Sequence, residues 1–298
     1  MTAPATPLAQ STRKGRREVK NALATAFTLV SFLIALVPLL FIVVYVFQRG
    51  SEVMSWSFLT EDLPFSNRRP GGGIYPAIVG TLVITGAAAA MALPLGVLGG
   101  IYLNEYGGNG FLARVVRFLA EVMTGVPSIV MGLFIYTIWV LPRKQDGISG
   151  FAGALALGAL MLPIVIRTTE EILKTVPDDL REGSYALGCR KARTIRTVVM
   201  PHAAPGVVSG ALLAVARAAG ETAPLIFVSS LYSTSVSTNP FGQLALPNIP
   251  VYIFKASEEA DPYGFARAWG AAFVLLSFIL LANIGARALG RSRLSSQR

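Results

Sequence analysis

The chain has few of the residues that soluble enzymes and metalloproteins use for their chemistry. Its 298 residues include a single cysteine, Cys189, and a single histidine, His202. One cysteine cannot form a disulfide within the chain, and one Cys with one His supplies too few ligands for the usual zinc sites. The sequence also lacks a G-x-x-x-x-G-K-[ST] loop, which binds nucleotide phosphates. We therefore expect a non-catalytic chain that has no metal or other cofactor of its own.

Charged residues are also scarce. They make up 14% of the chain, hydrophobic residues make up 53%, and mean hydropathy is +0.58, whereas a soluble domain carries about 25% charged residues. An apolar run of about 18 residues is long enough to cross a bilayer as a helix. The pattern predicts an all-α membrane protein with six transmembrane helices. The apolar runs are 24–47, 76–103, 115–141, 149–166, 205–229 and 268–287.

The distribution of basic residues predicts the orientation. With both termini in the cytoplasm, most Lys and Arg fall in cytoplasmic segments, as the positive-inside rule requires. We expect a basic cytoplasmic tail at 1–23, a membrane domain at 24–288 and a second cytoplasmic tail at 289–298. The net charge of +10 could suggest a nucleic-acid partner. The basic residues lie beside helix ends, however, where they face anionic lipid headgroups, so we expect membrane lipid and no nucleic acid.

The longest cytoplasmic loop carries the strongest local motif. Asp179 is predicted to cap a helix, with Glu182 as its capping-box partner. Gly188 is predicted to end that helix in the left-handed conformation. A second, basic helix would follow and end at Pro201. Two short helices at an angle would form a protruding elbow over residues 178–201.

The spacing within this elbow resembles a known signature. The sequence reads Glu182-Gly183-Ser184, three residues, Gly188, nine residues, then V-V-M-P ending at Pro201. It resembles the E-A-A, three residues, Gly, nine residues, I-x-L-P signature of ABC importer permeases, with Gly and Ser in place of the two alanines. In that family the elbow docks into a groove of the ATPase, so the resemblance implies an ATPase-coupling role for these five residues. The alternative is an ordinary cytoplasmic loop with a glycine-capped helix.

Further segments resemble the phosphate permeases within that family. Residues 124–132 are similar to their third helix, and 216–222 to their R-A-x-G-E-T stretch. The continuation Ala-Pro-Leu at 223–225 resembles the PstA branch rather than PstC, and the likeness spans about residues 70–288. It implies a type I importer permease fold in the bacterial cytoplasmic membrane, and import of inorganic phosphate by alternating access. It also implies a sister permease (PstC), two copies of an ATPase that binds ATP and Mg (PstB) and an extracytoplasmic phosphate-binding protein (PstS).

Two other functions stay open at this point. One is an ABC permease for another oxyanion, such as sulfate or molybdate. The R-A-x-G-E-T stretch argues against it, by resemblance alone. The other is a protein of a different class, either an ion-coupled transporter or an intramembrane enzyme. The elbow signature argues against the first, and the absence of a metal-ligand set or a nucleophile–base pair argues against the second.

The fifth apolar run carries an unusual ion pair. Arg217 lies about 18 Å into that run, near the middle of a hydrocarbon core about 30 Å thick. A charge there is costly, and Glu221, one helical turn further on, can neutralise it. Because a guanidinium binds oxyanions in a bidentate manner, we predict that Arg217 and Glu221 lie in the substrate pathway, with Thr222 and Ser128 as hydroxyl donors. The alternative is a structural pair that holds two helices together.

Three other residues in these runs are expected to have structural roles. Gly96 and Gly100 in the second run are predicted to allow close helix packing rather than ligand binding. Glu121 in the third run is predicted to reach water near the cytoplasmic end of its helix.

Overall fold

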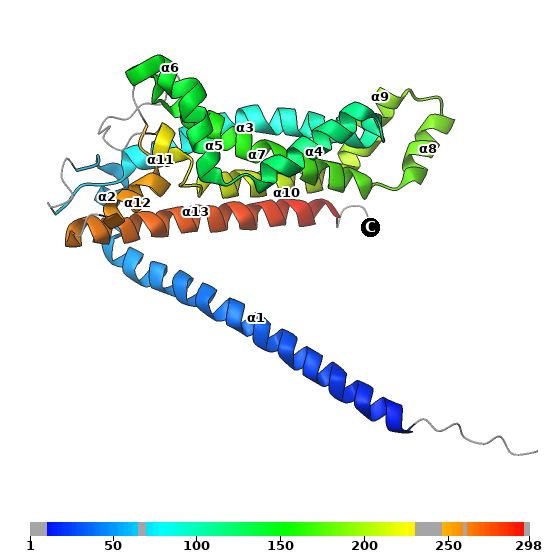
Figure 1. Cartoon of the computed structure of the whole chain (residues 1–298), viewed down its shortest axis with the longest axis horizontal. Coiled ribbons are helices and arrows are strands. Elements are labelled where there is room, and N and C mark those ends of the chain that lie inside the picture. The colour runs from blue at the N-terminus through cyan, green and yellow to red at the C-terminus, as the bar shows by residue number, and fades with distance from the viewer. Residues whose placement is uncertain (1–10, 65–69, 230–245, 259–260, 295–298) are drawn as a thin grey trace, which may run out of the picture. The chain divides into compact units, whose positions relative to one another are not determined.

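The computed structural model describes residues 11–64, 70–229, 246–258 and 261–294, and every regular element in these ranges is a helix (Figure 1). The chain divides into two compact units, Met1–Arg49 and Gly50–Arg298. The first unit holds most of α1 (Ser11–Val53), a 43-residue helix. This helix begins inside the segment 1–23 that was expected to be a tail, and residues 1–10 of that segment lie outside the described ranges.

Five helices in the described ranges are long and apolar enough to cross a membrane, and a sixth span is possible if one bent pair counts as a single crossing. The chain is therefore an all-α, multi-pass membrane protein. The five are α1, α3 (Tyr75–Ile101) with its π-helical extension η1 (Tyr102–Gly107), α7 (Gly150–Lys174), α10 (Met200–Ala219) with the preceding α9 (Lys191–Thr194) and η4 (Ile195–Val199), and α13 (Pro262–Leu294).

The bent pair and the shorter helices complete the second unit. The pair consists of α4 (Phe111–Gly125) and α5 (Ser128–Ile135), the latter continued by η2 (Tyr136–Val140) and α6 (Leu141–Arg143). The short elements are α2 (Trp56–Thr60), η3 (Lys144–Gly147), α8 (Asp178–Ala186), α11 (Leu225–Val228) and α12 (Ile249–Glu258). Helix α12 lies between two stretches outside the described ranges, residues 230–245 before it and residues 259–260 after it.

The core of the second unit is built around α7. This helix packs most extensively against α3 and also contacts α10, α4 and α5 (Figure 1). Close approach depends on small residues. A Cβ added to Gly96 would lie 2.7 Å from the Val165 side chain, and one added to Gly100 would lie 2.6 Å from Thr169. Small residues let membrane helices approach one another closely. The predicted packing role of both glycines is therefore confirmed.

The third apolar run is not one straight helix. The α4 and α5 axes differ by 104°. The sequence explains the break, because a residue before proline is driven out of the helical region, and Val126 before Pro127 is extended, with ψ 126°. Pro127 in turn precedes the first residue of α5. The expectation of one continuous helix over 115–141 was therefore wrong.

The fifth run is broken as well. The helix expected over 205–229 ends at Ala219, with Gly220 as its C-cap, and the chain resumes helical structure only in the four residues of α11. The intervening segment lies against α5, where a Cβ on Gly132 would be 2.5 Å from Cα of Pro224. Arg217 therefore lies in the last turn of α10, not in the middle of a helix.

Proline also explains two of the π-helical segments. Proline has no N–H to bond the carbonyl four residues earlier, and its ring clashes with that carbonyl. The segment η2 lies just before Pro142, and η4 lies just before Pro201. A wider π turn accommodates the missing bond without ending the helix. The prediction that Pro201 ends the second elbow helix was therefore wrong, because the helix continues into α10.

Candidate functional site: a pocket between two helix breaks and a cytoplasmic elbow

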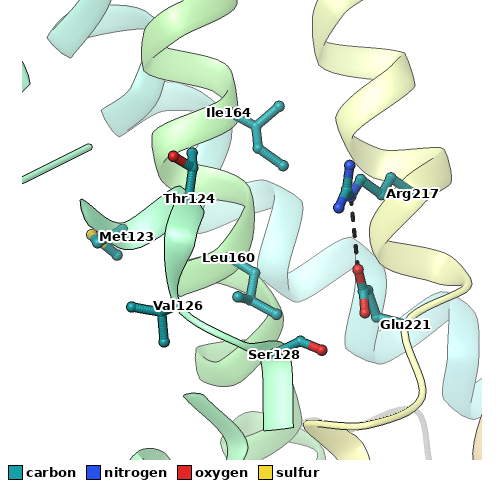
Figure 2. A pocket seen from close by; sticks show the side chains of 8 residues that line it. All are labelled: Met123, Thr124, Val126, Ser128, Leu160, Ile164, Arg217 and Glu221. Carbon is teal, nitrogen blue, oxygen red and sulfur yellow. Dashed lines mark ion pairs between the residues drawn. The ribbon is translucent and has the colours of Figure 1, made fainter. Parts of the chain in front are cut away.

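A pocket of about 230 Å³ lies where the two helix breaks meet α7 (Figure 2). The α4–α5 break contributes residues on both sides of Pro127, the last turn of α10 contributes Arg217, and the segment that follows α10 contributes Glu221. Non-helical backbone at membrane depth is tolerated where it is buried in protein or lines a cavity, and two breaks facing one pocket meet that condition. The lining residues are Met123, Thr124, Val126, Ser128, Leu160, Ile164, Arg217 and Glu221.

Three of the four predicted pathway residues line this pocket: Arg217, Glu221 and Ser128. In Figure 2 the Arg217 and Glu221 side chains occupy one wall, and the Ser128 hydroxyl points toward that wall. The spacing of Arg217 and Glu221 in the sequence already predicts that they lie close together, whereas Ser128 comes from a segment about ninety positions earlier. Thr222 does not line the pocket. Its carbonyl oxygen instead accepts hydrogen bonds from the amides of Leu225 and Ile226 at the start of α11.

The ion pair at the pocket is loose. Arg217 Nε lies 3.7 Å from Glu221 Oε1, which is too long for a hydrogen bond. The Arg217 side chain is 71% exposed, whereas that of Glu221 is 24% exposed. A guanidinium has five N–H donors, so this arrangement leaves Arg217 able to bind a second anionic group.

The wall opposite the ion pair is formed by the break itself. Ser128 begins α5, and the first amides of a helix have no intrahelical acceptor and carry partial positive charge. Thr124, on the other side of the break, uses its hydroxyl to bond the Glu121 carbonyl at 2.7 Å and so caps the end of α4. Sequence reasoning had not assigned Thr124 or the α7 residues Leu160 and Ile164 to the site. The Thr-Gly-Val-Pro-Ser pattern was the available signal.

A second ion pair lies one helical turn beyond the pocket. Glu121 precedes Thr124 on α4, Arg167 follows Ile164 on α7, and their side chains approach to 3.4 Å. The Glu121 side chain is largely exposed, which agrees with the expectation that it reaches water.

The elbow begins with α8 and its glycine stop. Gly188 has φ +77°, its N–H bonds the Tyr185 carbonyl at 2.9 Å, and the Cys189 N–H bonds the Ser184 carbonyl at 3.2 Å. This pair of bonds is the Schellman motif, so the prediction of a left-handed glycine at the end of this helix is confirmed. The start of the helix differs from the prediction. Pro177 is the N-cap residue, no side-chain cap bond forms and helix α8 includes Asp179, so the capping box of Asp179 and Glu182 was wrong.

The angle of the elbow is fixed by a buried hydrogen bond. Ser184 Oγ and Thr194 Oγ1 lie 2.8 Å apart and join α8 to α9. The serine at an alanine position of the signature therefore has a structural use. Glu182 and Gly183 are exposed on the outside of the elbow, and a Cβ on Gly183 would meet no atom of the described residues within 4 Å. Leu187 on the same outer surface is 86% exposed.

These features are typical of one class of membrane protein. Residues 92–294 match the family described as binding-protein-dependent transport system inner membrane component, and the chain belongs to that family. Within it, the chain belongs with the PstA permeases. It is 42% identical over 279 residues to "Phosphate transport system permease protein PstA 1" of Mycobacterium tuberculosis (strain ATCC 25618 / H37Rv), covering 91% of this chain and 87% of that protein.

Other relatives agree over nearly the same length. PstA of Mycobacterium leprae is 45% identical over 272 residues, 90% of this chain and 87% of its own. PstA of Yersinia pestis is 41% identical over 287 residues, 95% of this chain and 94% of its own. The resemblance found in the sequence is therefore confirmed.

Solved structures place the fold among ABC importer permeases. A chain of a bacterial ABC transporter involved in the import of the acidic polysaccharide alginate matches with a TM-score of 0.59, covering 93% of this chain and 99% of that chain at 15% identity. A chain of the inward-facing MetNI methionine ABC transporter matches with a TM-score of 0.57, covering 74% and 94% at 20% identity. The predicted type I importer permease fold is confirmed.

Proposed function

We propose that this chain is the membrane-embedded permease subunit of an ATP-driven importer of inorganic phosphate, and that phosphate passes through the pocket between the two helix breaks. The observation that carries the proposal is the meeting of Arg217, Glu221 and Ser128, from separate segments, at that pocket. Transporters commonly bind substrates where discontinuous helices meet near the bilayer midplane.

The chemistry of the pocket suits a tetrahedral oxyanion. Arg217 supplies the charge and the forked donors that match oxyanion geometry. The Ser128 hydroxyl and the first amides of α5 supply further donors, and the helix dipole adds partial positive charge. Glu221 keeps Arg217 partly neutralised when the pocket holds no anion. Because the pair is loose, the guanidinium can exchange Glu221 for the ion and later release it, whereas an unopposed arginine would hold the ion more tightly.

The elbow is the proposed contact with the ATPase. Glu182 and Gly183 lie on its exposed surface, and no atom of the described residues lies within 4 Å of a Cβ placed at 183. Contacts within the described part of the chain therefore do not explain the glycine, whereas close approach of another protein's surface to the helix backbone would. Ser184, Gly188 and Pro201 act indirectly, because they set the elbow angle and the path into α10.

The proposed partners follow from the family and the relatives' names. They are a sister permease (PstC), two copies of an ATPase (PstB) that binds ATP and Mg, and an extracytoplasmic phosphate-binding protein (PstS). Both termini and the elbow lie in the cytoplasm of a bacterium, and the chain crosses the inner membrane. Docking of loaded binding protein outside and closure of the ATPase inside alternate the access of the pocket, and this chain performs no hydrolysis itself.

Phosphate uptake in a strain that lacks its own high-affinity phosphate permease tests the proposal. We expect the chain, expressed with its partners, to restore uptake of labelled phosphate, and excess sulfate or molybdate to leave that uptake unchanged. Restored uptake of sulfate without phosphate would mean that the transporter imports another oxyanion. Uptake that persists when no ATPase copurifies with the chain would favour an ion-coupled transporter.

The elbow proposal has a separate test. We expect Gly183→Trp to fold and insert normally, because its side chain meets open space, but to lose copurification of the ATPase. Gly183→Ala is the matched control and should retain the ATPase. Normal ATPase binding by the tryptophan variant would contradict the docking role.

A further inference from the structure

We propose that two ion pairs with buried carboxylates, Arg181–Glu105 and Arg117–Glu170, form a mechanical link that carries movement of the elbow to α4 and so to the pocket. The inference rests on the proposed function, in which the elbow contacts the ATPase and the pocket passes the ion. It assigns positioning roles to residues that touch neither partner.

The first pair ties the elbow to the segment after α3. Arg181 on α8 donates from Nη2 to Glu105 Oε1 at 3.0 Å and to the Leu173 carbonyl at 3.0 Å. Its Nη1 donates to the Val176 carbonyl at 2.6 Å. Both side chains are nearly or fully buried, at 12% and 4% exposure. One guanidinium thus holds the elbow, the end of α7 and η1 in a single arrangement.

The second pair ties the same π-helical segment to α4. Arg117 donates from Nη2 to the Leu103 carbonyl at 2.9 Å and from Nη1 to the Gly108 carbonyl at 2.8 Å. Its Nε bonds Glu170 of α7 at 2.9 Å, and the Glu170 side chain is 3% exposed. The backbone of η1 is therefore held from the α4 side by Arg117, while its Glu105 side chain is held by the elbow.

A third contact lies next to these pairs. Lys191, at the start of α9, lies with Nζ 5.0 Å from the centre of the Tyr106 ring in η1, within the range of a cation–π interaction. The elbow therefore contacts η1 on both sides of its glycine turn, through Arg181 before Gly188 and through Lys191 after it. A movement of the elbow as a rigid body acts on η1 at two points.

The far end of α4 lines the pocket. Thr124 lies seven residues after Arg117 on the same helix, about two turns or roughly 10 Å further along. Because α4 is a single helix up to Gly125, a displacement at Arg117 moves the pocket wall. Directional bonds suit this task better than packing alone, because packed helices can slide past one another by small amounts, whereas a buried charge cannot leave its partner without a large cost.

In each ion pair, one side chain also bonds a second charged residue outside the pair. That second residue provides a matched control. Asp178 also bonds Arg181 at 3.0 Å, but it is 86% exposed and belongs to α8 itself. Lys174 also bonds Glu170 at 2.9 Å, but it lies on α7 with Glu170. Neither connects the elbow to α4. Changes at these two positions remove a charge contact of similar length without cutting the link.

The test uses the complete transporter in proteoliposomes with loaded binding protein, and measures phosphate transported per ATP hydrolysed. We expect Glu105→Gln and Arg117→Lys to lower that ratio about tenfold, within the range of coupling energies between sites, while ATPase copurification stays normal. Asp178→Asn and Lys174→Gln should stay within about twofold of the parent. An unchanged ratio in both link variants overturns the inference.

Movement can be followed directly to separate this inference from the proposed function. Spin labels at Leu119→Cys on α4 and at Ala192→Cys, an exposed α9 residue of the elbow outside the proposed ATPase contact, in a Cys189→Ser background, report both ends of the link. We expect ATP to change both signals in the parent, and Glu105→Gln to keep the elbow response and lose the α4 response. No elbow response in the parent would sink the proposed coupling function instead. A parallel fall of thermal stability, uptake and ATPase activity with a constant ratio would mean a purely structural role and overturn the link.

Discussion

At the scale of single residues, anion binding in the pocket depends on how far Glu221 neutralises the charge of Arg217. Its distance of 3.7 Å from Glu221 leaves the guanidinium available to an anion, while Glu221 limits how tightly an anion is held. Arg217 is the cation among the residues that line the pocket. An anion that crosses an apolar layer needs such compensation.

We expect Arg217→Gln to lower phosphate uptake roughly 70-fold or more, the factor that corresponds to about 2.5 kcal/mol of lost charge compensation. Assembly and ATPase binding should be unchanged. Glu221→Gln should do less harm, because the cation remains. The double variant should resemble Arg217→Gln when phosphate uptake by intact cells is measured.

A structural pair would give a different pattern in the same variants. Each single change would then leave one charge without its partner and lower thermal stability, and the double change would recover both stability and uptake. Recovery of both properties in the double variant would exclude contact of Arg217 with the substrate.

The turn of the elbow depends on backbone conformation at Gly188. A Cβ there would meet none of the described residues within 4 Å, but φ is +77°, which costs a β-branched residue about 1–3 kcal/mol. We expect Gly188→Val to insert but to lose most ATP-coupled uptake, whereas Gly188→Asn, which tolerates this conformation, should keep most of it. Equal uptake by the two variants would show that the left-handed turn is dispensable.

At the scale of elements, the close contact of α3 with α7 holds the second unit together. Gly96 and Gly86 both lie in α3 but differ in surroundings. A Cβ at Gly96 would be 2.7 Å from Val165, whereas a Cβ at Gly86 would meet no atom within 4 Å in the part of the chain that the structure describes. The same substitution at the two positions therefore distinguishes the cost of forcing α3 and α7 apart from the cost of placing a larger side chain in a helix.

We expect Gly96→Val to destabilise the protein by about 1–3 kcal/mol, the usual cost of overpacking, and Gly86→Val to have little effect. Thermal unfolding of the detergent-solubilised chain, followed by fluorescence-detected size exclusion, measures the difference. Equal unfolding temperatures would mean that α3 and α7 can separate without cost.

At the scale of the whole molecule, the proposed topology places the elbow and α2 on opposite sides of the membrane. Single cysteines introduced in a Cys189→Ser background can test this, because Leu187 and Trp56 are 86% and 79% exposed. We expect a membrane-impermeant maleimide to label Trp56→Cys in intact cells, and Leu187→Cys only after permeabilisation. Labelling of Leu187→Cys in intact cells would reverse the orientation.

Local signals in the sequence were reliable where one short segment decides the structure. The apolar runs predicted most of the long helices, Gly188 predicted the left-handed end of α8, and the spacing of Arg217 and Glu221 predicted their ion pair. Each of these features depends on residues that are close together in the sequence. The Pro127 break had a local signal as well. It was missed because apolar length was read as continuity, although Val126 before proline already disfavours a helix.

Contacts between distant segments could not be predicted in this way. Arg117 and Glu170 are 53 positions apart and Arg181 and Glu105 are 76 apart, and no periodicity indicates which charges meet. For the same reason Ser128 could be proposed only as one of two hydroxyl donors, of which Thr222 does not line the pocket, and Leu160 and Ile164 were not found. Pairings of this kind depend on how α7 packs between α3, α4 and α10.

The volume of the pocket has a consequence for selectivity. About 230 Å³ holds a tetrahedral oxyanion together with several waters, because each water needs only about 10–15 Å³ of such space. An ion that keeps part of its hydration shell loses little hydration free energy when it enters the pocket. Some of its hydrogen bonds are then to water rather than to the pocket wall, and any oxyanion of similar size can make such bonds. We therefore expect the pocket itself to distinguish phosphate from sulfate only weakly. The choice between them would be made earlier, by the binding protein that delivers the ion.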